Sequence, residues 1–319
     1  MEKKLANMLI ENSLELTSAD VLVIDYQNHT NKLFETIKKI AHERDIEIRE
    51  FARPSFPDLI SLQGLDKMID GATAYLKLGG GEYKNSLKSE AIAIQRKEGE
   101  IMNKRCELKW TLTPYPSEYM SSLLNIPMKN LRKIYFDCCF INYTDQKRIQ
   151  ETLASQFEPG EISIKSQDTN LKFNIVENPH YCNGKINVPD GEVFWEINPY
   201  RTEGQIKFNI PFIYGSARFK EMFFVFKDGK VIDYDSNQRD KLKELLETDY
   251  EAPYLGEFGI GTNSKAKLIG HSFIDEKVKG TFHLALGAMS LGLESRLHMD
   301  MVKSLKDCEI RNNGKKILF

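Results

Sequence analysis

A histidine and an aspartate occur two residues apart near the C-terminal end of the chain, in the segment RLHMDMV. This segment is predicted to be extended, and side chains two residues apart on a strand point to the same face. His298 and Asp300 could therefore bind one metal ion together or two neighbouring ions separately. A single HxD pair is weak evidence for a metal site, because such pairs are usually surface pairs or hydrogen-bonded couples.

Two further ligand-type residues lie upstream in apolar, glycine-containing stretches. His283 occurs in GTFHLALG, where a lone histidine is usually a core residue, but the later HxD pair makes ligation more plausible. Two histidines and one carboxylate are enough for a mononuclear metal site with open positions. Glu257 lies between glycines in YLGEFGIGTN, and a carboxylate in so apolar a stretch needs a cation or a set of hydrogen-bond donors.

A third stretch, NVPDGEVFWEIN, places a carboxylate directly after a Pro-Asp-Gly turn, at the start of a β-rich run. This residue is Glu192. Glu196 alternates with it and could lie on the same face of a strand, so spacing alone does not choose between the two. Each of these glutamates could also be an ordinary carboxylate at the edge of a loop.

The elements that must position these residues fall into two regions. Residues 1–155 alternate between apolar strands and amphipathic helices, which predicts βαβ units and a Rossmann-like α/β domain with a mostly parallel sheet. The predicted strands are 21–25, 46–52, 74–80 and 109–116, and the predicted helices are 28–45, 58–70 and 87–105. Cys138 and Cys139 lie in the apolar run KIYFDCCFI, which is strand-like and predicts two buried thiols.

Residues 156–319 have the alternation of antiparallel strands, with a hairpin turn at Asp228-Gly229 and one clear helix at 237–248. This pattern predicts a second, β-rich α+β domain that carries the metal-binding residues. Gly79-Gly80-Gly81 follows a predicted strand of the first domain, but its spacing matches no phosphate-binding motif and predicts a plain loop.

Composition excludes several classes of protein. The 319 residues are 41% hydrophobic and 28% charged, which is typical of a globular fold, and the net charge of −2 gives no basic surface for nucleic acid. No apolar run approaches the ~20 residues that span a bilayer, and the N-terminal segment lacks the features of a signal peptide. The five cysteines have no CxxC spacing. We therefore expect no membrane or nucleic-acid partner and a reducing, cytoplasmic location.

Four segments, in the order NVPDGEVF, YLGEFGIGTN, DEKVKGTFHLALG and HMD, resemble those of the aminopeptidase T/S family of metallopeptidases. The stretch LKWTLTPYPSEYMSSLLNIP is also similar, so the resemblance covers residues 20–305. It implies a divergent member of these thermophilic metalloaminopeptidase-like proteins. Such proteins have an N-terminal α/β domain and a C-terminal domain that holds two divalent ions, and they release N-terminal residues from small peptides, usually as homodimers. The family's metal ligands fall on Glu192, Glu257, His283, His298 and Asp300.

The resemblance favours Glu192 over Glu196 as a ligand. It also implies a mechanism in which zinc, cobalt or manganese activates a water molecule and Glu257, or another nearby carboxylate, moves the proton as general base and acid. Glu192 or a neighbouring acid would hold the free α-amino group of the substrate. Asp275 and Glu276 are candidate supporting acids.

The sequence departs from the family pattern near the first histidine ligand. The best-known members carry a tyrosine seven residues after this histidine, where this chain has Ser290, and the segment before His298 is short. Two alternatives to a peptidase therefore stay open. One is a mononuclear Fe(II) ring-cleaving dioxygenase of the 2,5-dihydroxypyridine type, which would use His283, His298 and Asp300. The other is a non-catalytic, peptidase-like binding protein.

Overall fold

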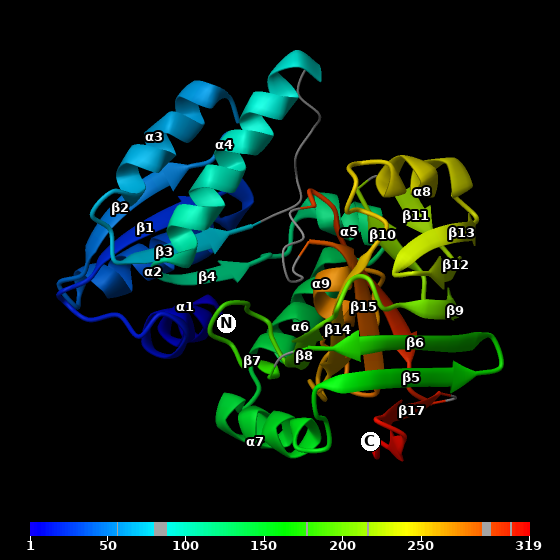
Figure 1. The fold of residues 1–319 in the computed structure, drawn as a ribbon. Coiled ribbons are helices and arrows are strands. Elements are labelled where there is room, and N and C mark those ends of the chain that lie inside the picture. The colour runs from blue at the N-terminus through cyan, green and yellow to red at the C-terminus, as the bar shows by residue number, and fades with distance from the viewer. Residues whose placement is uncertain (56, 80–87, 177, 216, 289–294, 307) are drawn as a thin grey trace. The chain divides into compact units, whose positions relative to one another are not determined.

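The structure is a computed structural model, and its chain folds into two units (Figure 1). It describes residues 1–55, 57–79, 88–176, 178–215, 217–288, 295–306 and 308–319. Unit 1 consists of residues 1–140 and 184–189, and unit 2 of residues 141–183 and 190–319. In the part of the chain that is described, no helix is both long and apolar enough to cross a bilayer.

Unit 1 is built on a parallel sheet with strand order β2-β1-β3-β4. Its strands are β1 (Val21–Tyr26), β2 (Glu47–Ala52), β3 (Ala74–Leu78) and β4 (Lys109–Thr113). Its helices are α1 (Glu2–Met8), α2 (Asn31–His42), α3 (Leu59–Ile69), α4 (Lys88–Cys106), α5 (Glu118–Leu124) and α6 (Met128–Cys139), with a π-helical turn at Leu9–Ser13 and a 3-10 turn at Asn28–Thr30.

Helices cover both faces of this sheet because its strands are apolar on both sides. In β1, Leu22 and Ile24 pack in one core with α1, α2 and α6, whereas Val23 points the other way, into a core with α3 and α4. Local signals fix the helix ends: Asp58 accepts the Ser61 backbone N–H at 2.7 Å and closes a capping box at the start of α3. The predicted mixed α/β character and parallel sheet are confirmed.

One local prediction in unit 1 was wrong. The run KIYFDCCFI is not a strand, because its first seven residues form the second half of helix α6. Tyr135, Phe136 and Cys139 are buried at helical spacing in one core with Leu22 and Ile24 of the sheet. Short apolar runs are ambiguous between a buried strand and the buried side of a helix, and here packing decides. The prediction that Cys138 and Cys139 are buried free thiols is confirmed.

Unit 2 is β-rich. Its strands are β5 (Gly160–Ser166), β6 (Thr169–Ile175), β7 (His180–Cys182), β8 (Glu192–Glu196), β9 (Glu203–Phe208), β10 (Phe212–Tyr214), β11 (Ala217–Phe219), β12 (Met222–Lys227), β13 (Lys230–Ser236), β14 (Leu255–Gly261), β15 (Thr281–Gly287), β16 (His298–Ser304), β17 (Glu309–Asn312) and β18 (Lys315–Lys316). Its helices are α7 (Tyr143–Ala154), α8 (Arg239–Leu246) and α9 (Ser272–Asp275).

Two antiparallel sheets share the core of unit 2. One has strand order β13-β12-β9-β6-β5-β17-β18, and the other has the order β16-β15-β14-β8-β7. Alternate side chains of each sheet point into a single apolar cluster, where Phe173 of β6 lies 5.3 Å from Phe258 of β14 between ring centroids. The predicted hairpin at Asp228-Gly229 joins β12 to β13, and both residues have positive φ there.

The division between the units differs from the predicted boundary. Residue 155 directly follows α7, and α7 belongs to unit 2. Residues 184–189 lie in unit 1 because the chain returns there to pair with β4. Leu112 donates its backbone N–H to Ile186 O at 2.8 Å and accepts from Val188 N at 2.9 Å.

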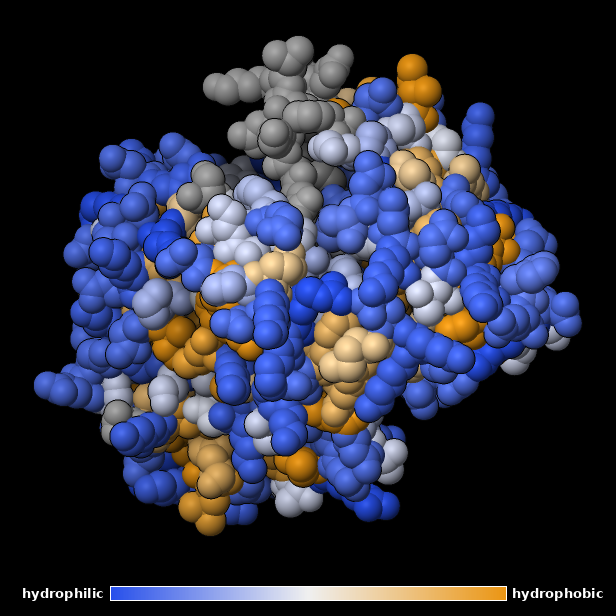
Figure 2. Space-filling model, turned by 180° about the vertical axis from the view of Figure 1, so that it is seen from behind, coloured by the Kyte–Doolittle hydropathy of each residue, from blue (hydrophilic) through white to orange (hydrophobic). Residues whose placement is uncertain are grey.

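On the face of the molecule in Figure 2, hydrophilic residues prevail and the apolar patches between them are small.

Candidate metal centre

The five-stranded sheet of unit 2 has one apolar face and one face that carries acidic and histidine side chains. In β14, Phe258 and Ile260 enter the core, so Glu257 and Gly259 point to the opposite face. The same alternation places His283 of β15, Asp300 of β16 and Glu192 of β8 on that opposite face. A register shift between Leu255 and Glu257 marks a bulge in β14, and bulges of this kind re-aim side chains near functional sites.

Glycine at position 259 makes room for the first histidine. Gly259 lies directly opposite His283 in the β14–β15 ladder, and a Cβ on this glycine would lie 2.1 Å from His283 Cε1. No side chain larger than hydrogen fits there unless the imidazole moves, because three ring atoms lie within 3.0 Å of the Cβ position. The motif GEFGIG therefore supplies both a carboxylate and the space in which its histidine partner sits.

The His283 ring points at two carboxylates. Its Nε2 lies 3.0 Å from Glu257 Oε1 and 3.6 Å from Glu192 Oε2, and all three side chains are buried. Ligand atoms of Glu257, His283 and Asp300 all lie within 4.8 Å of one another, a spacing that suits a single metal ion.

His298 and Asp300 form the other side of the cluster. His298 Nε2 lies 3.2 Å from Asp300 Oδ2, and His298 Nδ1 lies 3.3 Å from Ala288 O. The segment is a strand, as predicted, so the pair projects from one face of β16. The structure therefore brings all five predicted ligands into one cluster, linked by these contacts.

The donor set fits a divalent cation. Three buried atoms of the cluster have no hydrogen-bond partner among the described residues: Glu192 Oε2, His283 Nδ1 and Asp300 Oδ1. A buried carboxylate oxygen without a donor is costly unless a cation binds it. Mixed imidazole and carboxylate donors are typical of zinc, cobalt and manganese sites.

The carboxylates strongly perturb the titration of both histidines. Burial alone would lower the pKa of His283, but the Glu257 and Glu192 carboxylates outweigh burial and raise this pKa to about 9. For His298, burial is likewise outweighed, chiefly by Asp300, and the pKa rises to about 10. Burial opposes the charge on Asp300 too, yet the facing histidines hold the pKa of this carboxyl well below its usual range. Without a metal, both histidines are therefore imidazolium ions at neutral pH.

A buried lysine that was not predicted from the sequence lies beside these ligands. Lys277 is 1% exposed, and its Nζ lies 2.5 Å from Glu192 Oε1 and 2.6 Å from Glu276 Oε1. Burial lowers the pKa of this ammonium, but the surrounding carboxylates, with Glu192 foremost, outweigh burial and hold it well above its ordinary value. A lysine in a charged run such as DEKVKG is usually a surface residue, so the local sequence does not predict its burial.

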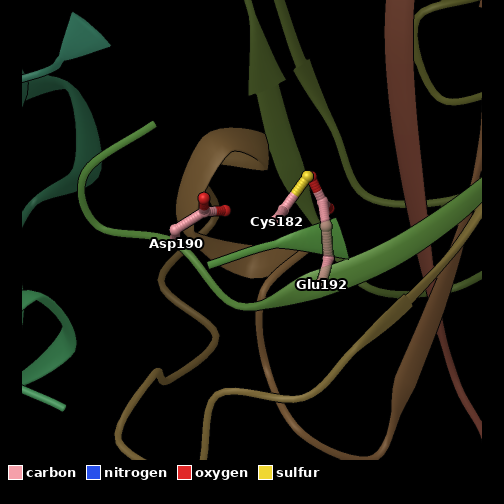
Figure 3. Close-up of side chains that lie close together, drawn as sticks. All are labelled: Cys182, Asp190 and Glu192. Atoms are coloured by element: carbon pink, nitrogen blue, oxygen red, sulfur yellow. The ribbon is translucent and has the colours of Figure 1, made fainter. Parts of the chain in front are cut away.

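A second group of metal-ligand-type side chains borders the first. Its members are Cys182 of β7, Asp190 in the loop between β7 and β8, and Glu192 of β8. Their ligand atoms also lie within 4.8 Å of one another. Figure 3 shows the Cys182 sulfur beside the Glu192 carboxylate, with the Asp190 carboxylate facing them from the adjoining segment. Lys277 Nζ lies 3.9 Å from Asp190 Oδ1, so the ammonium belongs to this group as well.

The remaining candidates take other roles or fall outside the description. Glu196 shares the face of Glu192 and pairs in register with Glu257, but Glu192 is the glutamate that contacts His283. Asp275 accepts the backbone N–H groups of Ile269 and Gly270 and closes that loop. Ser290 lies outside the described residues, as do Gly80 and Gly81 of the glycine run.

Comparisons with known proteins identify the family of this chain. Residues 82–307 match the sequence model of the thermophilic metalloprotease (M29) family. Aminopeptidase AmpS of Bacillus subtilis (strain 168) is 27% identical over 128 residues, which is 38% of this chain and 31% of AmpS. The matched region thus spans less than a third of that relative. The structure of wild-type AmpT from Thermus thermophilus aligns over 99% of both chains with a TM-score of 0.78 and 15% identity, so the two share a fold. Because the family model covers most of the chain, this protein belongs to the thermophilic metalloprotease (M29) family, as its motifs predict.

Proposed function

We propose that this protein is a metal-dependent aminopeptidase that releases N-terminal residues from small peptides. The observation that carries the proposal is the cluster of two histidines and three carboxylates in which buried ligand atoms lack partners. Membership of a metalloprotease family supports the same conclusion.

Glu192, Glu257, His283, His298 and Asp300 would hold the metal. A divalent ion bound there supplies a Lewis acid for the scissile carbonyl and lowers the pKa of a water ligand. Zinc, cobalt and manganese all suit these ligands. The resemblance predicts two ions.

The chain's own carboxylates would move the proton and orient the peptide. Glu257 keeps its Oε1 against His283 Nε2, and we assign its carboxylate the role of base, taking the proton from the attacking water and returning it to the leaving amine. Glu192 or a neighbouring acid would bind the free α-amino group of the substrate. An acidic group at this position explains a preference for free N-termini, because an ammonium is the natural partner of a carboxylate.

The proposal extends to the assembly and its surroundings. The family resemblance implies a homodimer, and the cysteine pattern suits a reducing, cytoplasmic environment. Light scattering of the purified protein tests the dimer: a mass of one chain at working concentration would contradict it.

The two alternatives are not favoured by the comparisons. The matched family is a metalloprotease family, and AmpS is named as an aminopeptidase. A ring-cleaving dioxygenase would instead bind one iron and take up oxygen with an aromatic diol.

The test is hydrolysis of short peptides by the purified chain loaded in turn with zinc, cobalt or manganese. We expect release of the free N-terminal residue, loss of release when the peptide N-terminus is acetylated, and loss of activity with a chelator. If no free-amino peptide in a broad panel is cleaved by any metal-loaded form, the proposal is wrong.

A further inference from the structure

The buried Lys277 ammonium lies against the group formed by Cys182, Asp190 and Glu192. On one side it contacts Glu192 Oε1 at 2.5 Å and lies 3.9 Å from Asp190 Oδ1. On the other it contacts Glu276 Oε1 at 2.6 Å. Three carboxylates therefore surround a single positive charge that has no exposure to solvent beyond 1% of its side chain.

The backbone holds this lysine in place. Lys277 donates its N–H to Ile274 O at 3.2 Å, and its carbonyl accepts from Asn263 N at 2.8 Å. The neighbouring residues pack directly on β14: a Cβ on Gly261 would lie 2.2 Å from Val278 O. Glycine at 261 is thus what lets the lysine segment cross the strand.

Lys277 also limits what Glu192 can bind. Of the two Glu192 oxygens, Oε1 is taken by the lysine and only Oε2, which faces His283, has no partner. In a site of two metal ions about 3.5–4 Å apart, a carboxylate that joins the ions uses both oxygens. A second ion on the side of Cys182 and Asp190 would have to expel the buried ammonium, leaving that charge without partners.

The other side of the cluster keeps a full set of ligands. Glu257, His283 and Asp300 have ligand atoms within 4.8 Å of one another, and Asp300 Oδ1 lacks a partner. Three protein ligands with open positions are enough for one catalytic ion.

We propose that the Lys277 ammonium takes the place of the second divalent ion, so that each chain binds a single ion, in the cluster of Glu257, His283, His298 and Asp300. Lys277 is then a positioning residue, which fixes Glu192 and supplies positive charge where a second ion would otherwise bind. The inference rests on the proposed metal site, but it concerns the number of ions and not the reaction.

Metal stoichiometry tests the inference without reference to activity. The metal-free protein is dialysed against increasing Mn²⁺, and bound manganese per chain is measured by elemental analysis. We expect saturation at one ion per chain and the six-line electron paramagnetic resonance spectrum of an isolated Mn²⁺. Saturation at two ions per chain, or a spectrum of two coupled ions, would overturn the inference.

The Lys277→Met variant tests the residue itself, because methionine has a similar length and no charge. Lys279→Met is the matched control, since this lysine is exposed on the same segment. We expect Lys277→Met to bind a second Mn²⁺ and Lys279→Met to keep one. A folded Lys277→Met chain that still saturates at one ion would overturn the assignment of Lys277. If this variant does not fold, the manganese count and the spectrum of the native chain still decide.

The outcomes also separate this inference from the proposed function. Peptide hydrolysis with two bound ions would leave the function standing and overturn only the role of Lys277. Failure to bind any Mn²⁺ at millimolar concentration, together with no hydrolysis, would overturn both.

Discussion

Each unit of the molecule buries a cluster of charges, and the two clusters differ in whether their atoms are satisfied. In unit 1, Asp25 of β1 accepts hydrogen bonds from Arg53 Nε at 2.7 Å and from Tyr75 Oη at 2.6 Å. Arg53 also reaches Glu98 of α4. No polar side-chain atom of Asp25, Arg53 or Tyr75 is among the described buried atoms that lack a partner. This cluster is complete as it stands.

The cluster in unit 2 is equally buried but incomplete. Glu192, His283 and Asp300 each keep a buried atom without a partner. Buried charge therefore does not distinguish a functional site from a structural one in this protein. What distinguishes the two is the unpaired carboxylate oxygens, because a buried carboxylate oxygen without a donor costs stability unless a cation binds it.

The largest effect is expected from removing an unsatisfied ligand. Asp300→Ala should abolish metal binding and lower peptide turnover on the order of 10³-fold, because the ion contributes several kcal/mol to transition-state stabilisation. His298→Ala should behave alike. Metal content by elemental analysis and kcat/KM measure the two effects.

Asp233→Ala on β13 is the matched control, since Asp233 is an exposed aspartate on a strand of the same unit. It should leave both metal content and turnover unchanged. Full metal content and turnover in Asp300→Ala would show that the unsatisfied cluster is not the metal site.

A substitution in the Asp25–Arg53 cluster of unit 1 should change the stability of the fold and not metal binding. Arg53→Met leaves the Asp25 carboxylate buried without its cation, which should lower the free energy of unfolding of unit 1 by about 3–5 kcal/mol. Urea denaturation measures the change. Metal content of the folded fraction should not change, because none of the five proposed metal ligands belongs to unit 1.

The double variant Asp25→Asn, Arg53→Met controls for the charge. It removes the uncompensated carboxylate and should recover part of the loss. Equal stability of Arg53→Met and the native chain would show that the Asp25–Arg53 pair is not what completes this cluster.

Metal binding should strengthen as pH rises. Metals bind neutral imidazole, and the pKa values of about 9 and 10 for His283 and His298 mean that both rings must lose a proton when the ion binds. From pH 7 to 9 the Kd should fall by up to about tenfold per pH unit for each proton released. Calorimetry in buffers of different ionisation enthalpy counts these protons, and an affinity independent of pH would contradict the prediction.

The metal-free protein should show the opposite trend. Both histidines have folded-state pKa values above the ordinary 6.5, so their contribution to stability is fully present below pH 6.5. It is lost as pH rises through 9 and 10. The urea midpoint of the metal-free chain should therefore fall over that interval, whereas the metal-loaded chain should not follow it.

The strands of the parallel sheet were predictable because each depends on local pattern. The βαβ alternation of unit 1 and the same-face spacing of His298 and Asp300 are properties of short segments. Spacing could not choose between Glu192 and Glu196, because both do lie on one face of β8. Glu192 contacts His283, which lies on a strand two positions away in the sheet, and this contact favours Glu192 over Glu196.

The burial of Lys277 could not be predicted from the sequence, because it too depends on a contact between distant segments. Nothing in DEKVKG predicts burial, since lysine ordinarily keeps its charge in water. Its burial depends on packing of the segment over Gly261, a contact that joins residues far apart along the chain in a way that no local pattern records. Helix α6 was predicted as a strand because its apolar run is short, and a short apolar run does not distinguish a buried strand from the buried side of a helix.

The smallest effects on metal binding and stability are expected from substitutions of two glycines, one in each unit. Gly259→Ala would place a Cβ 2.1 Å from His283 Cε1 and push the ring off its carboxylates. A displaced ligand should weaken metal binding about 10–100-fold, as loss of ligand support does elsewhere. Gly64 lies in helix α3 with nothing within 4 Å of its Cβ position, so Gly64→Ala should raise stability by about 1 kcal/mol and leave metal binding unchanged. Titration with Mn²⁺ and urea denaturation of both variants measure these effects. If Gly259→Ala binds Mn²⁺ as tightly as Gly64→Ala does, His283 is not held by this close approach, and its place among the ligands is in doubt.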